Sequence, residues 1–200
     1  MSSFTLSGLP GTLEWKNQPV DSKVDFGTLT IVAGDQTDWF NAPDGSIIKG
    51  NAPIALFTPP DDQFTLRARV SVDFLATFDA GVIFVYENES TWAKLCFELS
   101  PQGSPMVVSV VTKGTSDDCN SVPIDGTSIY LRVMRDRQAF AFHYSLDGRV
   151  WSLVRYFSLG ALNQLQMGLS SQAPTGTQCS ATFSEVEYRQ GALKDIRSTE

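Results

Sequence analysis

The chain has 200 residues, and 15 basic residues against 22 acidic ones give it a formal net charge of −7. An acidic surface argues against nucleic acid as a partner, because phosphate backbones bind basic surfaces, and against docking on anionic lipid. The three cysteines, Cys96, Cys119 and Cys179, are an odd number at wide spacing, which favours a reducing compartment over a disulfide scaffold. The first residues contain no basic start and no long apolar run. We therefore expect no secretory signal and no membrane span, and we predict a cytoplasmic protein.

The first third of the chain predicts short strands joined by polar turns. Residues 9–15 and 28–32 each predict a strand. A long polar loop over residues 34–45 then carries two adjacent large aromatic residues, Trp39 and Phe40. Aromatic side chains of this size rarely stay exposed in a loop, so they either pack beneath it or line a ligand site.

The middle of the chain contains the clearest strand patterns. Residues 64–74 alternate between apolar and polar side chains, which is typical of a strand with one face in a core. Residues 80–86 are apolar on both faces and predict a central strand that is covered on both sides. Residues 92–99 alternate again, and residues 106–112 are rich in β-branched side chains. We expect residues 113–126 to form a polar loop.

The stretch from Ile129 to Trp151 predicts a meander of three antiparallel strands. Its first two runs alternate between apolar and polar residues. Asp147 and Gly148 between alternating runs are a strong hairpin signal, because a type I′ turn needs positive φ at both central residues. The third strand is predicted to start at Arg149.

The last forty residues predict closing strands over residues 168–174 and 181–188, preceded by a short helix or helical turn over residues 159–166. Together, about twelve to fourteen short strands and almost no helix indicate an all-β sandwich or barrel. We expect one domain over residues 1–200, with a core from about 8 to 190 and a frayed C-terminal tail.

Several segments carry a resemblance to a known family. They are Thr37-Asp-Trp-Phe, Ala80 to Glu98, Val108 to Asp118, Tyr130 to Arg135, Phe142-His-Tyr-Ser-Leu-Asp-Gly-Arg-Val-Trp and Met167-Gly-Leu-Ser-Ser-Gln-Ala-Pro. Together they resemble the regulation-of-enolase family, a domain of unknown function in the concanavalin A-like lectin/glucanase superfamily. The resemblance implies a jelly-roll β-sandwich of two curved antiparallel sheets, with a ligand site on the concave sheet. It also implies three kinds of relative: carbohydrate-linked proteins, a fungal branch associated with enolase regulation, and cyclisation catalysts of secondary metabolism.

Familiar catalytic motifs are missing from the sequence. Superfamily hydrolases often carry Glu-x-Asp-x-x-Glu on one strand, and this spacing is absent, although Asp73 and Glu98 could converge across strands. His143 is the only histidine, and the cysteines lack ligand spacing, so we predict no metal and no cofactor. The segment from Ser145 to Trp151 is reminiscent of the Asp-box hairpin of sialidases, where the aspartate supports its own turn and the tryptophan packs beneath it.

One set of residues combines charges with aromatic rings. If the apolar faces of the strands line the core, one opposite face offers polar groups for hydrogen bonds and rings for stacking. The predicted set is Arg69, Ser71, Asp73, Phe84, Tyr86, Trp92, Lys94, Glu98, Arg132 and His143, with Trp39 and Phe40 at its rim. The alternative is a solvated sheet exterior with cross-strand ion pairs such as Arg69–Glu98 or Lys94–Asp73.

Three functions remain open at this stage. The first is a protein that binds a small organic or carbohydrate-like molecule, without hydrolytic machinery. The second is a cofactor-free cyclisation enzyme of the hetero-Diels–Alder type, in which His143, Arg69 or Lys94 polarises a carbonyl and orientation supplies the rate enhancement. The third is an interaction module with a protein partner such as enolase, or with a second copy of the chain.

Overall fold

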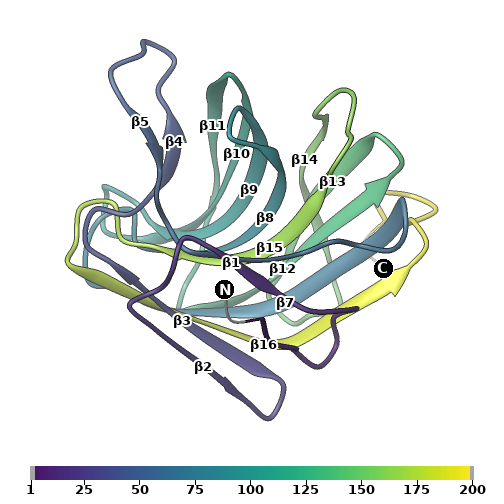
Figure 1. Cartoon of the computed structure of the whole chain (residues 1–200), viewed down its shortest axis with the longest axis horizontal. Helices are drawn as coiled ribbons and strands as arrows, with labels where there is room; N and C mark the ends of the chain where they lie inside the picture. The colour runs from purple at the N-terminus through teal and green to yellow at the C-terminus, as the bar shows by residue number, and fades with distance from the viewer. Residues whose placement is uncertain (1–2, 199–200) are drawn as a thin grey trace.

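The computed structural model describes residues 3–198, which form sixteen β-strands and no helix. The strands build two seven-stranded antiparallel sheets, packed face to face, and a separate two-stranded hairpin (Figure 1). Of the two architectures that the strand count left open, sandwich or barrel, the chain forms the sandwich, and the two antiparallel sheets implied by the family resemblance are confirmed. Since the described residues contain no helix, none of them forms a helix able to cross a membrane.

We call the two layers the front sheet and the back sheet. The front sheet contains, in spatial order, β1 (Glu14–Lys16), β6 (Ile54–Phe57), β15 (Gln166–Gln172), β8 (Ala80–Asn88), β9 (Thr91–Leu99), β10 (Pro105–Lys113) and β11 (Thr115–Pro123). The back sheet contains β14 (Ser152–Ser158), β13 (Ala139–Ser145), β12 (Ser128–Asp136), β7 (Gln63–Asp73), β16 (Gln178–Gln190), β3 (Thr28–Gly34) and β2 (Asp21–Asp25). The hairpin of β4 (Trp39–Asn41) and β5 (Ile48–Gly50) stands beside the curved strands β8–β11 in Figure 1.

The main core lies between the two sheets, where alternate residues of each strand point inward. It includes Leu66 and Val70 from the back sheet and Ile83 and Leu95 from the front sheet, all fully buried. The sheets come close at Gly81, where an added Cβ would lie 2.5 Å from Cγ1 of Val70. A larger residue at this position would push the layers apart.

A second core covers the outer face of the front sheet. Trp39 from the hairpin is 1% exposed, and its indole Nε1 donates a hydrogen bond of 2.9 Å to the carbonyl of Ala52. Its ring packs edge-on against Phe84, Tyr86 and Trp92, with centroids 5.7–6.0 Å apart. The prediction that residues 80–86 form a strand covered on both sides is thus confirmed, and the hairpin is what covers its outer face.

Two predicted segments are wrong. Residues 113–126 were expected to be a loop, but β11 pairs with β10; it is polar because it forms the exposed edge of its sheet. Residues 159–166 form no helix: Leu159 and Leu165 are buried in the core, and the Glu87 carboxylate accepts hydrogen bonds from backbone N–H groups of Asn163 and Gln164. The spacing of the apolar residues in this segment arises because Leu159 and Leu165 each insert separately into the core, and not because they share one face of a helix.

The β12–β13–β14 meander is confirmed, but its second turn differs from the prediction. Gly148 has a φ of 72°, whereas Asp147 is not among the residues with positive φ, so the turn is not type I′. Side chains hold the turn instead. Asp147 accepts hydrogen bonds from the N–H groups of Arg149 and Val150, and Ser145 Oγ accepts one from Gly148. The third strand accordingly starts at Ser152, three residues later than expected.

Candidate functional site

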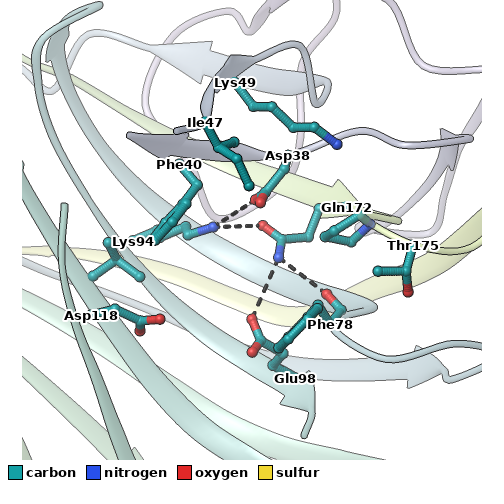
Figure 2. A pocket seen from close by; sticks show the side chains of 12 residues that line it. Asp38, Phe40, Ile47, Lys49, Phe78, Lys94, Glu98, Asp118, Gln172 and Thr175 are labelled. Atoms are coloured by element: carbon teal, nitrogen blue, oxygen red, sulfur yellow. Dashed lines mark hydrogen bonds and ion pairs between the residues drawn. The ribbon is translucent and has the colours of Figure 1, made fainter. Parts of the chain in front are cut away.

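A cavity of about 240 Å³ opens between the front sheet and the β4–β5 hairpin. Its residues come from the hairpin, from β9, β10, β11 and β15, and from the loops before β8 and after β15. The lining consists of Asp38, Phe40, Ile47, Lys49, Phe78, Lys94, Glu98, Val110, Asp118, Gln172, Pro174 and Thr175 (Figure 2). We call this cavity the front pocket.

The floor of the front pocket is a chain of hydrogen-bonded polar side chains. Alternation along β9 turns Lys94 and Glu98 to the same outer face, and the register of β15 with β8 brings Gln172 into the row of Glu98. Lys94 Nζ donates hydrogen bonds of 2.9 Å to Asp38 Oδ1 and to Gln172 Oε1. Gln172 Nε2 in turn donates to the carbonyl of Phe78 at 3.1 Å and to Glu98 Oε2 at 3.4 Å (Figure 2).

Lys94 is a buried cation with a counter-ion. Its side chain is 3% exposed, and that of its partner Asp38 is 16% exposed. Burial is the largest single influence and lowers the pKa of Lys94, but the acidic groups around it, with Asp38 the foremost, together raise the pKa well above its usual value. The ammonium group therefore stays charged at physiological pH.

Glu98 is a buried carboxyl without a direct cation partner. Burial is the main cause that raises its pKa to about 8, against an opposing effect of Lys94. The pKa of Asp118 is also raised, because the effect of its partial burial exceeds the opposing effect of Lys94. At pH 7 Glu98 is protonated and can donate a hydrogen bond into the pocket.

The rim of the front pocket carries three large apolar side chains beside the polar Lys49, Asp118 and Thr175. Phe40 is partly exposed, Ile47 is 46% exposed and Phe78 is 37% exposed. Phe78 is held in place by a backbone hydrogen bond from its N–H to the carbonyl of Leu99 and by the Gln172 side chain. The pocket thus combines a polar floor with rings at its mouth, which is the usual composition of small-molecule sites.

The predicted site residues fall into two groups on opposite sides of the sandwich. Lys94, Glu98 and Phe40 line the front pocket, and Phe84, Tyr86 and Trp92 share its sheet face but are buried beneath the hairpin with Trp39. The back sheet holds the second group: Arg69, Ser71, Asp73, Arg132 and His143.

The expectation of one shared face is therefore wrong, because alternation separates inside from outside but does not say which sheet a strand joins. The suggested ion pairs Arg69–Glu98 and Lys94–Asp73, and a hydrolytic pair of Asp73 with Glu98, would each join the two sheets. Arg69 instead donates a hydrogen bond to Ser128 Oγ within the back sheet.

Nine of the twelve lining residues of the front pocket were not predicted as site residues, among them Asp38, Phe78, Asp118 and Gln172. Asp38 precedes Trp39 directly and Gln172 lies in an alternating run, yet neither position identifies a partner for Lys94. Among residues 3–198 no three His, Cys, Asp or Glu side chains are grouped so that they could hold a metal ion.

The fold and the pocket define an all-β sandwich protein with a small, polar-floored cavity on an outer face. Residues 15–191 match the family described as Protein of unknown function (DUF1349), and the chain belongs to this family. The family description states no activity, so the regulation-of-enolase resemblance remains a prediction. No curated protein matches the chain at a significant level.

Solved structures show the same fold at low identity. A functionally unknown protein from Saccharomyces cerevisiae is 23% identical, with a TM-score of 0.83 over 90% of this chain and 97% of that one. The GH43 BlXynB protein from Bacillus licheniformis is 16% identical, with a TM-score of 0.67 over 82% of this chain, which spans only 33% of that protein. An alginate lyase from Klebsiella pneumoniae is 15% identical, with a TM-score of 0.51 over 84% and 83% of the two chains. At these identities the likeness concerns the fold alone.

Proposed function

We propose that the protein binds a small, uncharged, oxygen-rich organic molecule in the front pocket. The observation that carries the proposal is the floor of the pocket, where a matched ion pair and a protonated carboxyl lie beneath a rim that carries large apolar side chains. Lys94 is neutralised by Asp38, and Glu98 is uncharged at pH 7 because its pKa is about 8. A charged ligand would find no free counter-charge among these three groups, whereas hydroxyl and carbonyl groups would find donors and acceptors.

The size of the pocket limits the ligand. A volume of about 240 Å³ is below the range of roughly 300–1,000 Å³ that is usual for drug-sized ligands. The pocket therefore fits a single sugar ring or a compact polyol or lactone, or one end of a larger molecule. Phe40 and Phe78 supply faces on which the apolar side of a ring can stack.

Calorimetric titration of a defined panel tests this proposal. The panel contains D-xylose, D-glucose and 4-hydroxy-6-methyl-2-pyrone, each titrated into the wild-type protein and into three variants. We expect at least one compound to bind, and Phe40→Ala and Glu98→Gln to weaken its binding at least tenfold. Phe26→Ala is the matched control, because Phe26 is a fully exposed phenylalanine in the turn between β2 and β3, away from the pocket lining. Binding that is unchanged in the two pocket variants, or no binding by any compound, would contradict the proposal.

A second candidate is cofactor-free cyclisation in the same pocket, and one observation favours it. The pKa of Glu98, at about 8, lies close to neutral pH, where a positioned carboxylic acid is an effective proton donor to a carbonyl oxygen. Lys94 lies on the same floor, where its charge, partly offset by Asp38, would favour negative charge that develops on this oxygen. Of the residues predicted as catalytic, Lys94 fits this role, while Arg69 and His143 belong to the other sheet.

Mass spectrometry separates catalysis from binding. An intramolecular cyclisation that releases no group leaves the mass unchanged and alters the retention time, so every compound that binds is incubated with wild-type protein and with Glu98→Gln. Catalysis predicts an isomeric product whose rate falls at least a hundredfold in Glu98→Gln. Binding without any isomeric product would reject catalysis and support the proposal that the protein only binds the compound.

A further inference from the structure

The outer face of the back sheet contains a row of basic side chains that the front pocket does not use. Cross-strand register aligns Glu187 of β16 with Arg67 of β7, Arg67 with Arg132 of β12, and Arg132 with His143 of β13. Residues opposite one another on adjacent strands lie about 5 Å apart, so these side chains are direct neighbours. We call Arg67, Arg132 and His143 the basic row.

Buried polar atoms without a partner are concentrated in this row. Among the described residues, three of the six buried side-chain atoms without a hydrogen bond are Arg132 Nε, Arg132 Nη2 and His143 Nδ1, and a fourth is Arg67 Nε, which makes an ion pair instead. Arg67 still has a counter-charge, because Glu187 Oε2 lies 2.7 Å from its Nε. Arg132 has no ion pair within the described residues although it is only 6% exposed, and His143 is fully buried.

A buried guanidinium without a counter-charge lowers the stability of the folded protein, so we asked what Arg132 contributes in return. Leaving a buried donor unsatisfied costs about 1–3 kcal/mol, and more for a charged group. Burial, together with the neighbouring Arg67, lowers the pKa of Arg132 to about 10, and no carboxylate offsets this effect. A bound anion would satisfy both free N–H groups and supply the missing charge.

Two features of Arg132 suit recognition of a carboxylate. Its guanidinium carbon lies 4.2 Å from the ring centre of Trp151, so the indole supports the group through a cation–π contact. The two free atoms, Nε and Nη2, form one edge of the guanidinium and present two parallel N–H bonds. This edge matches the two oxygens of a carboxylate, which would accept both bonds at once.

His143, which lies opposite Arg132 on the neighbouring strand, adds a hydrogen-bond acceptor. Its Nε2 lies 2.9 Å from the carbonyl of Ile196, so Nε2 carries the proton and donates it, and Nδ1 has a free lone pair. Burial, and to a smaller extent Arg132, lowers the pKa of His143 to about 4, which keeps the ring neutral. The segment that carries Ile196 is the yellow C-terminal end in Figure 1, and its residues 191–198 are only partly buried.

We propose that Arg132 and His143 form a binding site for a small hydroxycarboxylate anion on the outer face of the back sheet. The carboxylate bridges Nε and Nη2 of Arg132, and a hydroxyl next to it donates to Nδ1 of His143. The C-terminal segment at Ile196 forms the cover of this site. The proposal does not depend on the front pocket, which lies on the other sheet.

Titration with glycolate, acetate and inorganic phosphate at constant ionic strength tests the site, with calorimetry and amide chemical shifts as readouts. We expect glycolate to bind with a Kd of about 1 mM or tighter, and acetate to bind at least threefold more weakly because it lacks the hydroxyl. Arg132→Lys keeps the charge but loses the two-pronged edge, so it should weaken glycolate at least tenfold. Arg132→Met should abolish binding and keeps a side chain that can cover Trp151.

Two controls keep the outcome decisive. Arg69→Met removes an exposed arginine from β7 of the same sheet and should leave glycolate binding unchanged, as should Phe40→Ala in the front pocket. Circular dichroism and the thermal midpoint establish that each variant folds. Equal binding in wild type and Arg132→Met, tighter binding of phosphate than of glycolate, or no binding at 50-fold above the expected Kd, about 50 mM, would each overturn the proposal.

Discussion

Lys94 on the outer face of the front sheet and Arg132 on the outer face of the back sheet are both buried cations, but their pKa values shift in opposite directions. Lys94 on the front sheet lies 2.9 Å from a carboxylate, and its pKa is raised; Arg132 on the back sheet has no carboxylate, and its pKa is lowered to about 10. Both are at least nine-tenths buried. The contrast shows that burial alone does not fix the state of a charge, since the nearest opposite charge decides the direction of the pKa.

The largest effect is expected when Lys94 loses its charge. Lys94→Met leaves the Asp38 carboxylate largely buried without its cation, and we expect the free energy of unfolding to fall by about 3–5 kcal/mol. Denaturant titration measures the loss. The double variant Lys94→Met with Asp38→Asn removes both charges and should recover more than half of it. A loss under about 1 kcal/mol in the single variant would contradict the assigned ion pair.

Glu98 makes the front face sensitive to alkaline pH. Its pKa of about 8 in the folded protein lies above the usual value of 4.5, so its contribution to stability is complete below pH 4.5 and is lost as the pH rises through 8. At pH 8 the loss is about 4 kcal/mol, because each unit of pKa difference corresponds to about 1.4 kcal/mol. Glu98→Gln should remove this part of the pH dependence in urea unfolding between pH 5 and 9. The exposed Glu14→Gln should retain it.

His143 makes the back face sensitive to acid. Its pKa is lowered from 6.5 to about 4 in the folded protein, so the stability it contributes is present above pH 6.5 and is lost as the pH falls through 4. The expected loss is about 3 kcal/mol. Comparing unfolding curves of wild type and His143→Gln from pH 7 to 4 checks it. Parallel curves for the two proteins would show that the histidine does not titrate in this window.

The smallest effect is expected at Arg132. Arg132→Met leaves no carboxylate without a partner and keeps an apolar stem against Trp151, so the free energy of unfolding should change by less than about 1 kcal/mol, or rise. Denaturant titration in parallel with Lys94→Met makes the comparison direct. A loss as large as that of Lys94→Met would mean that Arg132 has a counter-charge in the folded protein, and the contrast between the two faces would fail.

The fold could be predicted from the sequence because its rules are local. Alternation in residues 64–74 and 92–99 identifies strands and their inward faces, and Asp147 with Gly148 marks a turn. The site could not be predicted to the same extent, because its contacts join residues far apart in the chain. Lys94 and Glu98 were identified from their strand, but Asp38 and Gln172 are 56 and 78 positions from Lys94.

The assignment of all polar outer residues to one face failed for a related reason. Arg132 and His143 obey the same alternation as Lys94, and only the strand order shows that they belong to the other layer. Pairing between strands depends on turn geometry and on the packing of whole sheets. One residue pattern therefore fits two opposite faces equally well.

The β4–β5 hairpin ties the shape of the front pocket to the stability of the protein. It supplies the tryptophan that covers the second core and part of the pocket wall, and Asp38, which neutralises Lys94, directly precedes its first strand. An outward movement of the hairpin would expose the buried ring of Trp39 and would also separate Lys94 from the Asp38 carboxylate. Under the proposed function, a ligand would therefore enter through the open mouth of a pocket that is already formed, and the shape of the pocket would select it without closure of the hairpin.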